Sequence, residues 1–156
     1  MPDQYKSLYE SFRWLVPTNF NIGHECCHRW ANSSADARRI ALFFEDETGR
    51  REVWTYERIA ATANQLSNGL IRMGVQRGDR VSAYLPNTPE AVIAFLATAS
   101  LGAIWSVCAP DMAVPAIVDR FRQIEPKVLI AADGVHYAGK PIDRSAPGAG
   151  LRAELP

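Results

Sequence analysis

The sequence has few of the residues on which small extracellular proteins depend for stability. Among its 156 residues, only Cys26, Cys27 and Cys108 are cysteines. Two are adjacent and the third is left over, so they make no disulfide framework, which favours a reducing compartment such as the cytoplasm. The first stretch, MPDQYKSLYESFRWLVP, is interrupted by charges, and we expect no secretory signal peptide there.

A net charge is also lacking. Lysine plus arginine and aspartate plus glutamate both number 17, which gives a formal charge of zero. Such a chain has no basic field to attract nucleic acid or an anionic membrane surface, so we expect neither as a partner. The length and the 47% hydrophobic content are typical of one soluble globular domain.

Residues 91–110 are uncharged and long enough to cross a bilayer. However, Gly102 divides this run, and Thr88-Pro89-Glu90 before it is typical of a helix start, with proline at the first helical position. We therefore expect a buried helix over residues 89–101, then a strand from Ala103, and no membrane span.

The rest of the chain alternates between strand and helix patterns. Residues 40–46 and 51–56 predict a hairpin, and apolar residues at helical spacing predict a helix from Tyr56 that ends before Gly74. Further strands are expected over 80–85, 103–107 and 127–133, with helices over 89–101 and 114–124. This order predicts an α/β fold in which crossover helices connect the strands of a mostly parallel sheet. Residues 143–150 read as a loop, and LRAELP resembles the opening of a helix, so we expect a truncated polypeptide.

The stretch GHECCHRW contains H-E-x-x-H, the zinc-peptidase signature. On an α-helix, Ile22, Cys26, Cys27 and Trp30 form one apolar face, and the two histidines lie on the opposite, solvated side. A metal there would lack a dry cleft and a third ligand. We therefore predict no metal site and a surface helix with chance histidines.

The stretch GVHYAGKP fits the phosphate-binding P-loop pattern G-x-x-x-x-G-K and follows a predicted strand. Pro141 stands where the magnesium-binding serine or threonine belongs, and no helical pattern follows at once. We reject a Walker-type ATPase. The backbone N–H groups of Ala138 and Gly139, with the cation of Lys140, still offer an anion a place to bind.

Several long segments together resemble the AMP-forming acyl-CoA synthetases of the adenylate-forming superfamily. FNIGHECCHRWA resembles the family's first helix, and WTYERIAATANQLSNGLIRMGVQRGDRVSAYLPNTPEAVIAFLATASLGAIWSV resembles its first crossover units. APDMAVPAIVDRFRQIEPKVLIAADGVHYAGK is most similar to the acetoacetyl- and acetyl-CoA synthetase branch. The resemblance extends over roughly residues 5 to 140 and implies the N-terminal part of the ligase's large domain.

The resemblance implies three parts: an N-terminal helical segment over 1–35, an α/β N-terminal subdomain of the AMP-binding domain over 36–142, and a loop with the start of a truncated continuation over 143–156. The parent enzyme would join a carboxylic acid to CoA with ATP and Mg²⁺, through an acyl-adenylate. The family's Ser/Thr/Gly-rich phosphate loop, its nucleotide-binding segments and its catalytic lysine have no counterpart here. We therefore assign no catalytic residue and no metal ligand, and expect the chain alone to be inactive and to bind none of these tightly.

One site is carried over from the resemblance. Acetyl-CoA synthetases have a short Arg-Ala-Gly-Arg stretch that lines the nucleotide end of CoA, and the matching residues here are Tyr137, Ala138, Gly139 and Lys140. Lys140 keeps the second cation, whereas Tyr137 replaces the first arginine and one residue is inserted. The resemblance thus implies that Lys140 meets a CoA phosphate as a point charge.

Two other interpretations stay open. The parent protein could be the adenylation domain of a peptide synthetase or a luciferase-like ligase, in which the acceptor is not CoA. Alternatively, the chain could work alone as a binding module without chemistry. The sequence identifies neither the acid nor the oligomeric state.

Overall fold

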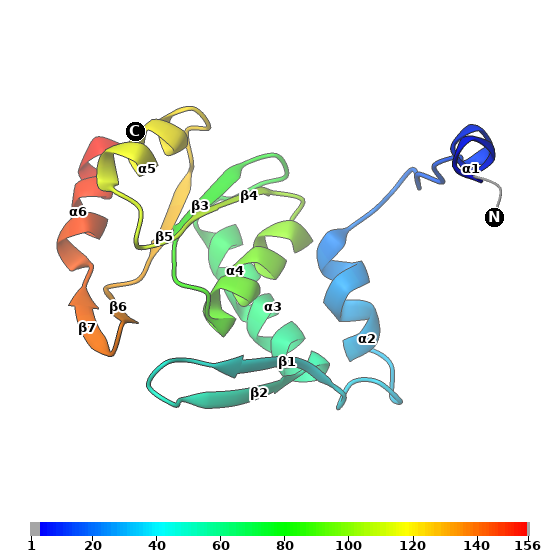
Figure 1. Ribbon diagram of the computed structural model, residues 1–156, viewed down its shortest axis with the longest axis horizontal. Helices are drawn as coiled ribbons and strands as arrows, with labels where there is room; N and C mark the ends of the chain where they lie inside the picture. The colour runs from blue at the N-terminus through cyan, green and yellow to red at the C-terminus, as the bar shows by residue number, and fades with distance from the viewer. Residues whose placement is uncertain (1–3, 156) are drawn as a thin grey trace.

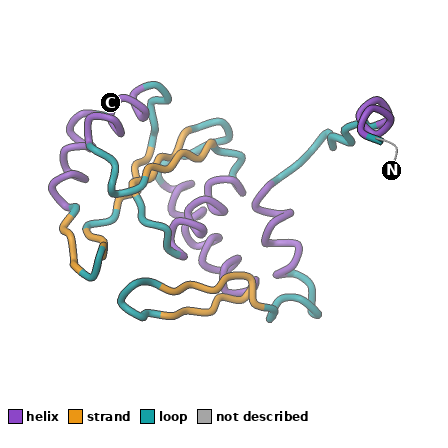
Figure 2. The backbone as a smooth tube through the Cα atoms, in the orientation of Figure 1, coloured by secondary structure: helices purple, strands orange, loops and turns teal. Residues whose placement is uncertain are grey.

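The computed structural model describes residues 4–155. An N-terminal arm, with helix α1 (Tyr5–Ser11) at its end, projects from the rest of the molecule (Figure 1). After this arm in the chain, a π-helical turn η1 (His24–His28) continues into the short helix α2 (Arg29–Ala31). Among the described residues, the body contains two antiparallel hairpins, one three-stranded sheet and four longer helices. Figure 2 shows the helices in purple and the strands in orange.

The first hairpin pairs β1 (Ile40–Glu45) with β2 (Arg51–Thr55), as the sequence predicts. Helix α3 (Tyr56–Arg72) follows at once, because the Thr55 side chain accepts a hydrogen bond from the N–H of Arg58 and caps the first turn. Gly74, at φ 81°, ends the helix in the left-handed conformation that glycine adopts without strain. Hairpin and helix are therefore both confirmed.

Three parallel strands form the central sheet in the order β4-β3-β5. They are β3 (Arg80–Tyr84), β4 (Ile104–Cys108) and β5 (Val128–Ala131). Helices α4 (Pro89–Ser100) and α5 (Val114–Arg122) make the crossovers between them. The predicted α/β fold with a parallel sheet and crossover helices is confirmed.

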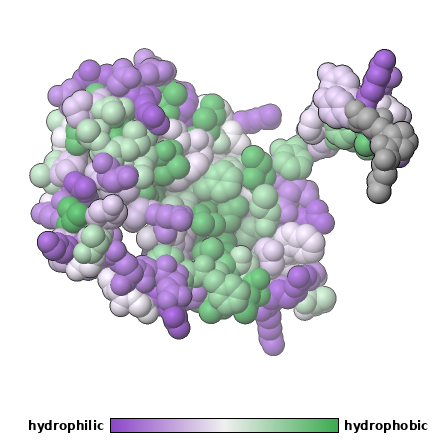
Figure 3. Space-filling view, in the orientation of Figure 1, coloured by the Kyte–Doolittle hydropathy of each residue, from purple (hydrophilic) through white to green (hydrophobic). Residues whose placement is uncertain are grey.

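The side chains of β3 alternate between two apolar clusters. Val81 packs into the cluster formed with α3 and α4, whereas Tyr84 packs with α5 and its hydroxyl donates to the carbonyl oxygen of Pro110 at 2.8 Å. Figure 3 shows apolar residues gathered in the middle of one face, over α3 and α4, with a more hydrophilic rim. The central strand is thus covered on both sides, as a parallel sheet requires.

No described helix is long and apolar enough to cross a membrane. The uncharged run folds as predicted, since α4 begins at Pro89 and ends before Gly102, and β4 follows. At 12 residues, α4 is about 18 Å long, well short of a bilayer's hydrocarbon core.

The C-terminal prediction is wrong in its secondary structure. A short hairpin of β6 (Gly134–Tyr137) and β7 (Lys140–Asp143) leads into helix α6 (Ser145–Glu154), where the sequence predicts a loop over 143–150. LRAELP therefore contains the end of a helix and not its opening.

Tertiary packing explains this helix despite its glycines. Leu151 is fully buried in the cluster of Tyr84 and Phe121. The Asp143 carboxylate accepts hydrogen bonds from the N–H and the hydroxyl of Ser145, and Pro147 falls in the first turn, where it breaks no helical hydrogen bond. Burial of one apolar side chain outweighs weak helix propensity here.

Candidate functional site

The two histidines of H-E-x-x-H lie in different surroundings. His24 is exposed. In His28, Nδ1 lies 2.9 Å from the carbonyl oxygen of Gly23, and Nε2 lies 2.8 Å from the side-chain oxygen of Asn64 on α3. Both ring nitrogens of His28 are thus engaged, and no group of three histidine, cysteine, aspartate or glutamate residues within 4–155 is placed to hold a metal ion.

The predicted orientation of this helix is partly wrong. Cys27 is buried and Trp30 lies near Tyr56, but Cys26 and Ile22 are exposed, and His28 turns toward α3. The reason is that His24–His28 is a π-helical turn, in which the N–H of Arg29 reaches back five residues to the carbonyl of His24. The wider turn changes which side chains share a face.

The P-loop pattern folds as a β-hairpin. Tyr137 and Lys140 are cross-strand partners at its end, Ala138 and Gly139 are the two turn residues, and Pro141 belongs to β7. The next helix begins only at Ser145. A phosphate loop that runs directly into a helix is therefore absent at this position.

The turn itself has the backbone of a type I′ hairpin. Both central residues have positive φ, 52° at Ala138 and 74° at Gly139. Successive backbone N–H groups in turn conformations make small anion-binding concavities. Tyr137 is 68% exposed and Lys140 is exposed too, and within residues 4–155 the Lys140 ammonium has no ion-pair partner.

One donor of the turn is already used. The N–H of Gly139 donates to a carboxylate oxygen of Glu47 at 3.3 Å. The sequence alone predicts that this N–H can bind an anion, and it gives no sign of the contact with Glu47. Glu47 lies 92 positions earlier in the chain, in the turn between β1 and β2. Sequence reasoning missed it because nothing local connects the two hairpins.

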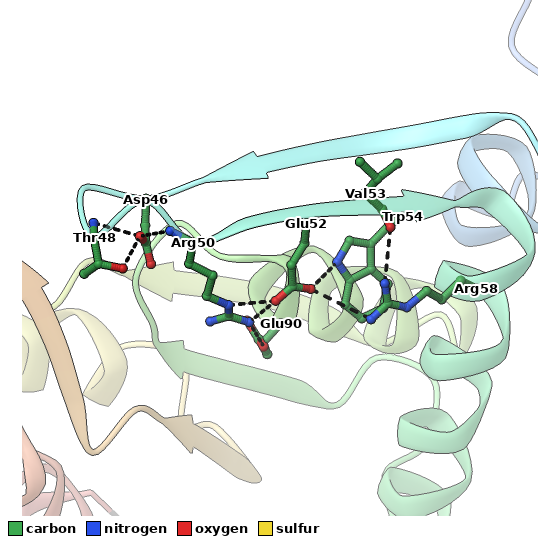
Figure 4. A network of polar contacts seen from close by, with 8 residues as sticks. All are labelled: Asp46, Thr48, Arg50, Glu52, Val53, Trp54, Arg58 and Glu90. Atoms are coloured by element: carbon green, nitrogen blue, oxygen red, sulfur yellow. Dashed lines mark hydrogen bonds and ion pairs between the residues drawn. The ribbon is translucent and has the colours of Figure 1, made fainter.

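Asp46 shapes the turn that presents Glu47. One oxygen of its carboxylate accepts hydrogen bonds from the N–H and the hydroxyl of Thr48, at 2.9 and 2.6 Å, and from the N–H of Arg50 at 3.1 Å (Figure 4). The Thr48 hydroxyl is the main cause that holds the pKa of Asp46 below its usual value. The turn is thereby fixed by its own residues.

A charged network anchors this hairpin to the body. The Arg50 guanidinium bonds to Glu52 and lies 3.7 Å from Glu90 at the start of α4. Glu52 also accepts from the indole N–H of Trp54 at 2.8 Å, and Arg58 stacks over the Trp54 ring at 3.6 Å (Figure 4). The hydrogen bond from Arg50 is the largest cause of the lowered pKa of Glu52.

A groove of about 370 Å³ separates the two hairpins. Its lining comes from residues 44–47 and Arg50 of the first hairpin, from residues 86–88 after β3, and from residues 134–136 of β6. Because β3 and β5 are neighbours whose following connections leave in different directions, their carboxyl ends form a switch point, where open α/β sheets bind ligands. Glu47 is part of the groove's lining, and the 137–140 turn follows directly after the lining residues of β6.

Comparisons with known proteins agree with this architecture. The family model described as AMP-binding enzyme matches residues 27–154. The acetoacetyl-CoA synthetase of Mus musculus is 44% identical over 140 residues, which are 88% of this chain and 20% of that protein. The acetyl-coenzyme A synthetase of Streptomyces avermitilis is 36% identical over 129 residues, 83% of this chain and 20% of that protein.

The solved structure of acetoacetyl-CoA synthetase from Streptomyces lividans superimposes with a TM-score of 0.83 at 42% identity. The match covers 92% of this chain and 22% of that one. This chain thus spans about a fifth of the length of the relatives it matches. With most of its residues inside the family model, the chain belongs to the AMP-binding enzyme family.

Proposed function

We propose that this chain forms the N-terminal α/β layer of an ATP-dependent, AMP-forming carboxylate–CoA ligase. The observation that carries the proposal is the match to a solved acetoacetyl-CoA synthetase over nearly the whole chain, at 42% identity. The proposed parts are the helical segment over 1–35, the α/β subdomain over 36–142, and a continuation that begins at 143. The cytoplasm is the proposed location, since the three cysteines are free in the structure.

The proposed reaction has two steps. The carboxylate oxygen of the acid attacks the α-phosphorus of ATP, and pyrophosphate leaves, which gives an acyl-adenylate. The thiol of CoA then attacks the acyl carbon, AMP leaves, and the thiol proton passes to solvent or to a base. A carboxylate is a poor electrophile, and the mixed anhydride supplies the good leaving group that the second step requires.

This chain's share in that reaction is structural support and one edge of the CoA site. We assign no residue to either chemical step. Mg²⁺ would accompany ATP in the whole enzyme, but the described residues contain no cluster fit to hold it, so no ligand is assigned here. Tyr137, Ala138, Gly139 and Lys140 are the proposed contacts for the nucleotide end of CoA, supported by the exposure of all four residues at the end of a hairpin.

A panel of short carboxylic acids tests the reaction. The polypeptide encoded by the complete reading frame, given ATP, Mg²⁺ and CoA, should release AMP and pyrophosphate in equal amounts with acetoacetate or acetate. Acyl-adenylate without any thioester would instead favour a carrier-protein or luciferase-like acceptor. If no acid of the panel led to release of pyrophosphate, the proposed function would be overturned.

The CoA contact has its own test. Lys140→Ala should raise the KM for CoA about two- to five-fold, as expected for one exposed charge pair. Lys140→Arg should keep the KM near that of the wild type, because it retains the cation. Equal KM values for the wild type and Lys140→Ala would remove this residue from the CoA site.

A further inference from the structure

The contact between Glu47 and the 138–139 turn puts a negative charge at a backbone donor suited to anions. The carboxylate oxygen of Glu47 is 3.3 Å from the nitrogen of Gly139, and both turn residues have positive φ. A backbone N–H in such a turn binds phosphate and carboxylate oxygens alike, since both are acceptors with negative charge. A side chain of this protein therefore already occupies an anion position.

The position of Glu47 results from local order on its own side of the groove. Three hydrogen bonds to one oxygen of Asp46 close the 46–50 turn. Arg50 bonds to Glu52 within the same hairpin and forms an ion pair with Glu90 of α4. The turn that carries Glu47 toward the β6–β7 hairpin is thus stabilised by hydrogen bonds among its own residues. Among the described residues no ion pair joins Glu47 to Lys140, so the backbone donor is its recorded partner there.

We propose that Glu47 acts as an internal competitor: its carboxylate fills the anion position of the 138–139 turn, and a phosphate group that binds there must displace it. Glu47 would then lower the affinity of the turn for phosphate and disfavour anions that do not also bind Lys140. The identity of the phosphate rests on the proposed function, in which CoA supplies it. The competition itself depends only on the turn and the carboxylate.

The size of the effect follows from exposure. Glu47, Gly139 and Lys140 are all exposed, so the charges interact through water and are screened by salt. Removal of the carboxylate charge should therefore strengthen phosphate binding by only about two- to five-fold at low salt. The difference should shrink as salt is raised.

Glu47→Gln is the informative variant, because its amide oxygen still accepts from the N–H of Gly139 while the charge is gone. Glu57→Gln, which neutralises an exposed glutamate on α3, is the matched control for net charge. The ¹⁵N-labelled 156-residue chain is titrated with adenosine 3′,5′-bisphosphate, and the backbone amide shifts of Ala138 and Gly139 are followed. Pantetheine, which has no phosphate, is titrated in parallel.

The proposal predicts a dissociation constant for the bisphosphate about two- to five-fold lower in Glu47→Gln than in the wild type and Glu57→Gln. Pantetheine should leave both amides unmoved in every variant. Equal dissociation constants in all three proteins, weaker binding in Glu47→Gln, or no shift of either amide would overturn it. Because this titration needs no ligase activity, its result is independent of the result of the carboxylic-acid panel that tests the proposed function.

Discussion

At the scale of single residues, the 138–139 turn holds both of its central residues at positive φ. Glycine adopts a positive φ freely, but Ala138, at φ 52°, does so against the preference of any residue with a Cβ. The sequence Ala-Gly does not predict a type I′ turn, because the first central position of such a turn more often holds asparagine or aspartate. The strain at Ala138 therefore became visible only in the structure.

Replacement of Ala138 tests this strain. Asparagine tolerates the left-handed region, so Ala138→Asn should raise the free energy of unfolding by about 0.5–1 kcal/mol. Valine, whose branched Cβ is worse there, should lower it. Urea denaturation followed by circular dichroism measures both variants. The same sign of change for Asn and Val would mean that the backbone at this turn is not strained.

A second residue-scale prediction concerns Asp79 in the GDRV turn. Its carboxylate accepts from the Lys127 ammonium at 2.9 Å and from the N–H of Gln76 at 2.8 Å. The hydrogen bond from Lys127 is the largest cause that holds the pKa of Asp79 below its usual 3.8. A carboxyl whose pKa is lower in the folded state stabilises the fold at pH values above its unfolded-state pKa. This stabilisation is lost as the pH falls through the folded-state pKa.

Asp79→Asn should therefore unfold more easily than the wild type at pH 6 to 7, and the difference should shrink as the pH falls below about 4. Asp111→Asn, at an exposed carboxylate in the loop before α5, is the control for the loss of one negative charge. Thermal melts between pH 2.5 and 7 give the comparison. A difference that grows on acidification would have the wrong sign for this account.

At the scale of secondary-structure elements, the strongly patterned segments were predictable and the weakly patterned ones were not. Helix α3 follows from the spacing of Ile59, Ala63 and Leu70, all buried, and its end follows from Gly74. Helix α6 does not follow from the sequence pattern, because its sequence is rich in small residues and its stability comes from burial of Leu151 against distant elements. The π-helical turn was equally invisible, since periodicity assumes 3.6 residues per turn.

The π-helical turn makes the two histidines of H-E-x-x-H unequal, and this gives an element-scale prediction. His28 joins the turn to α3 through Asn64, so His28→Ala should lower the free energy of unfolding by about 1–2 kcal/mol. His24→Ala, at an exposed position, should change it by less than about 0.5 kcal/mol. Chemical denaturation of both variants, with and without zinc, is the measurement.

Equal losses in the two variants would contradict this account of the helix. So would a zinc-dependent rise in melting temperature that His24→Ala abolishes, since it would show that the histidines act together on a metal.

At the scale of the whole molecule, apolar surface remains open in the described residues. On the N-terminal arm, the side chains of Trp14 and Leu15 are 82% and 96% exposed. In the sheet, Ile104 and Val107 of β4, a strand paired on one side only within the described chain, are about half exposed. Exposed apolar patches mark surfaces that meet other protein. This supports the proposal that the chain is one layer of a larger ligase.

The residues of the candidate site stay a prediction, and the surroundings of that site became visible only in the structure. The 137–140 stretch was found through its family resemblance, and the structure places it at a hairpin end beside the switch point of the sheet. Glu47 was not found, because only the folded chain brings the two hairpins together. Short-range patterns identify elements, whereas contacts over 92 positions depend on how the elements pack.

The central claim is that this polypeptide supports a reaction whose catalytic groups lie outside it. The most direct measurement compares pyrophosphate release by the 156-residue chain with that of the polypeptide from the complete reading frame, each supplied with acetoacetate, ATP, Mg²⁺ and CoA. The account predicts turnover by the longer polypeptide and none by the shorter one. Thioester formation by the 156-residue chain alone, or a reading frame that ends at Pro156, would contradict it.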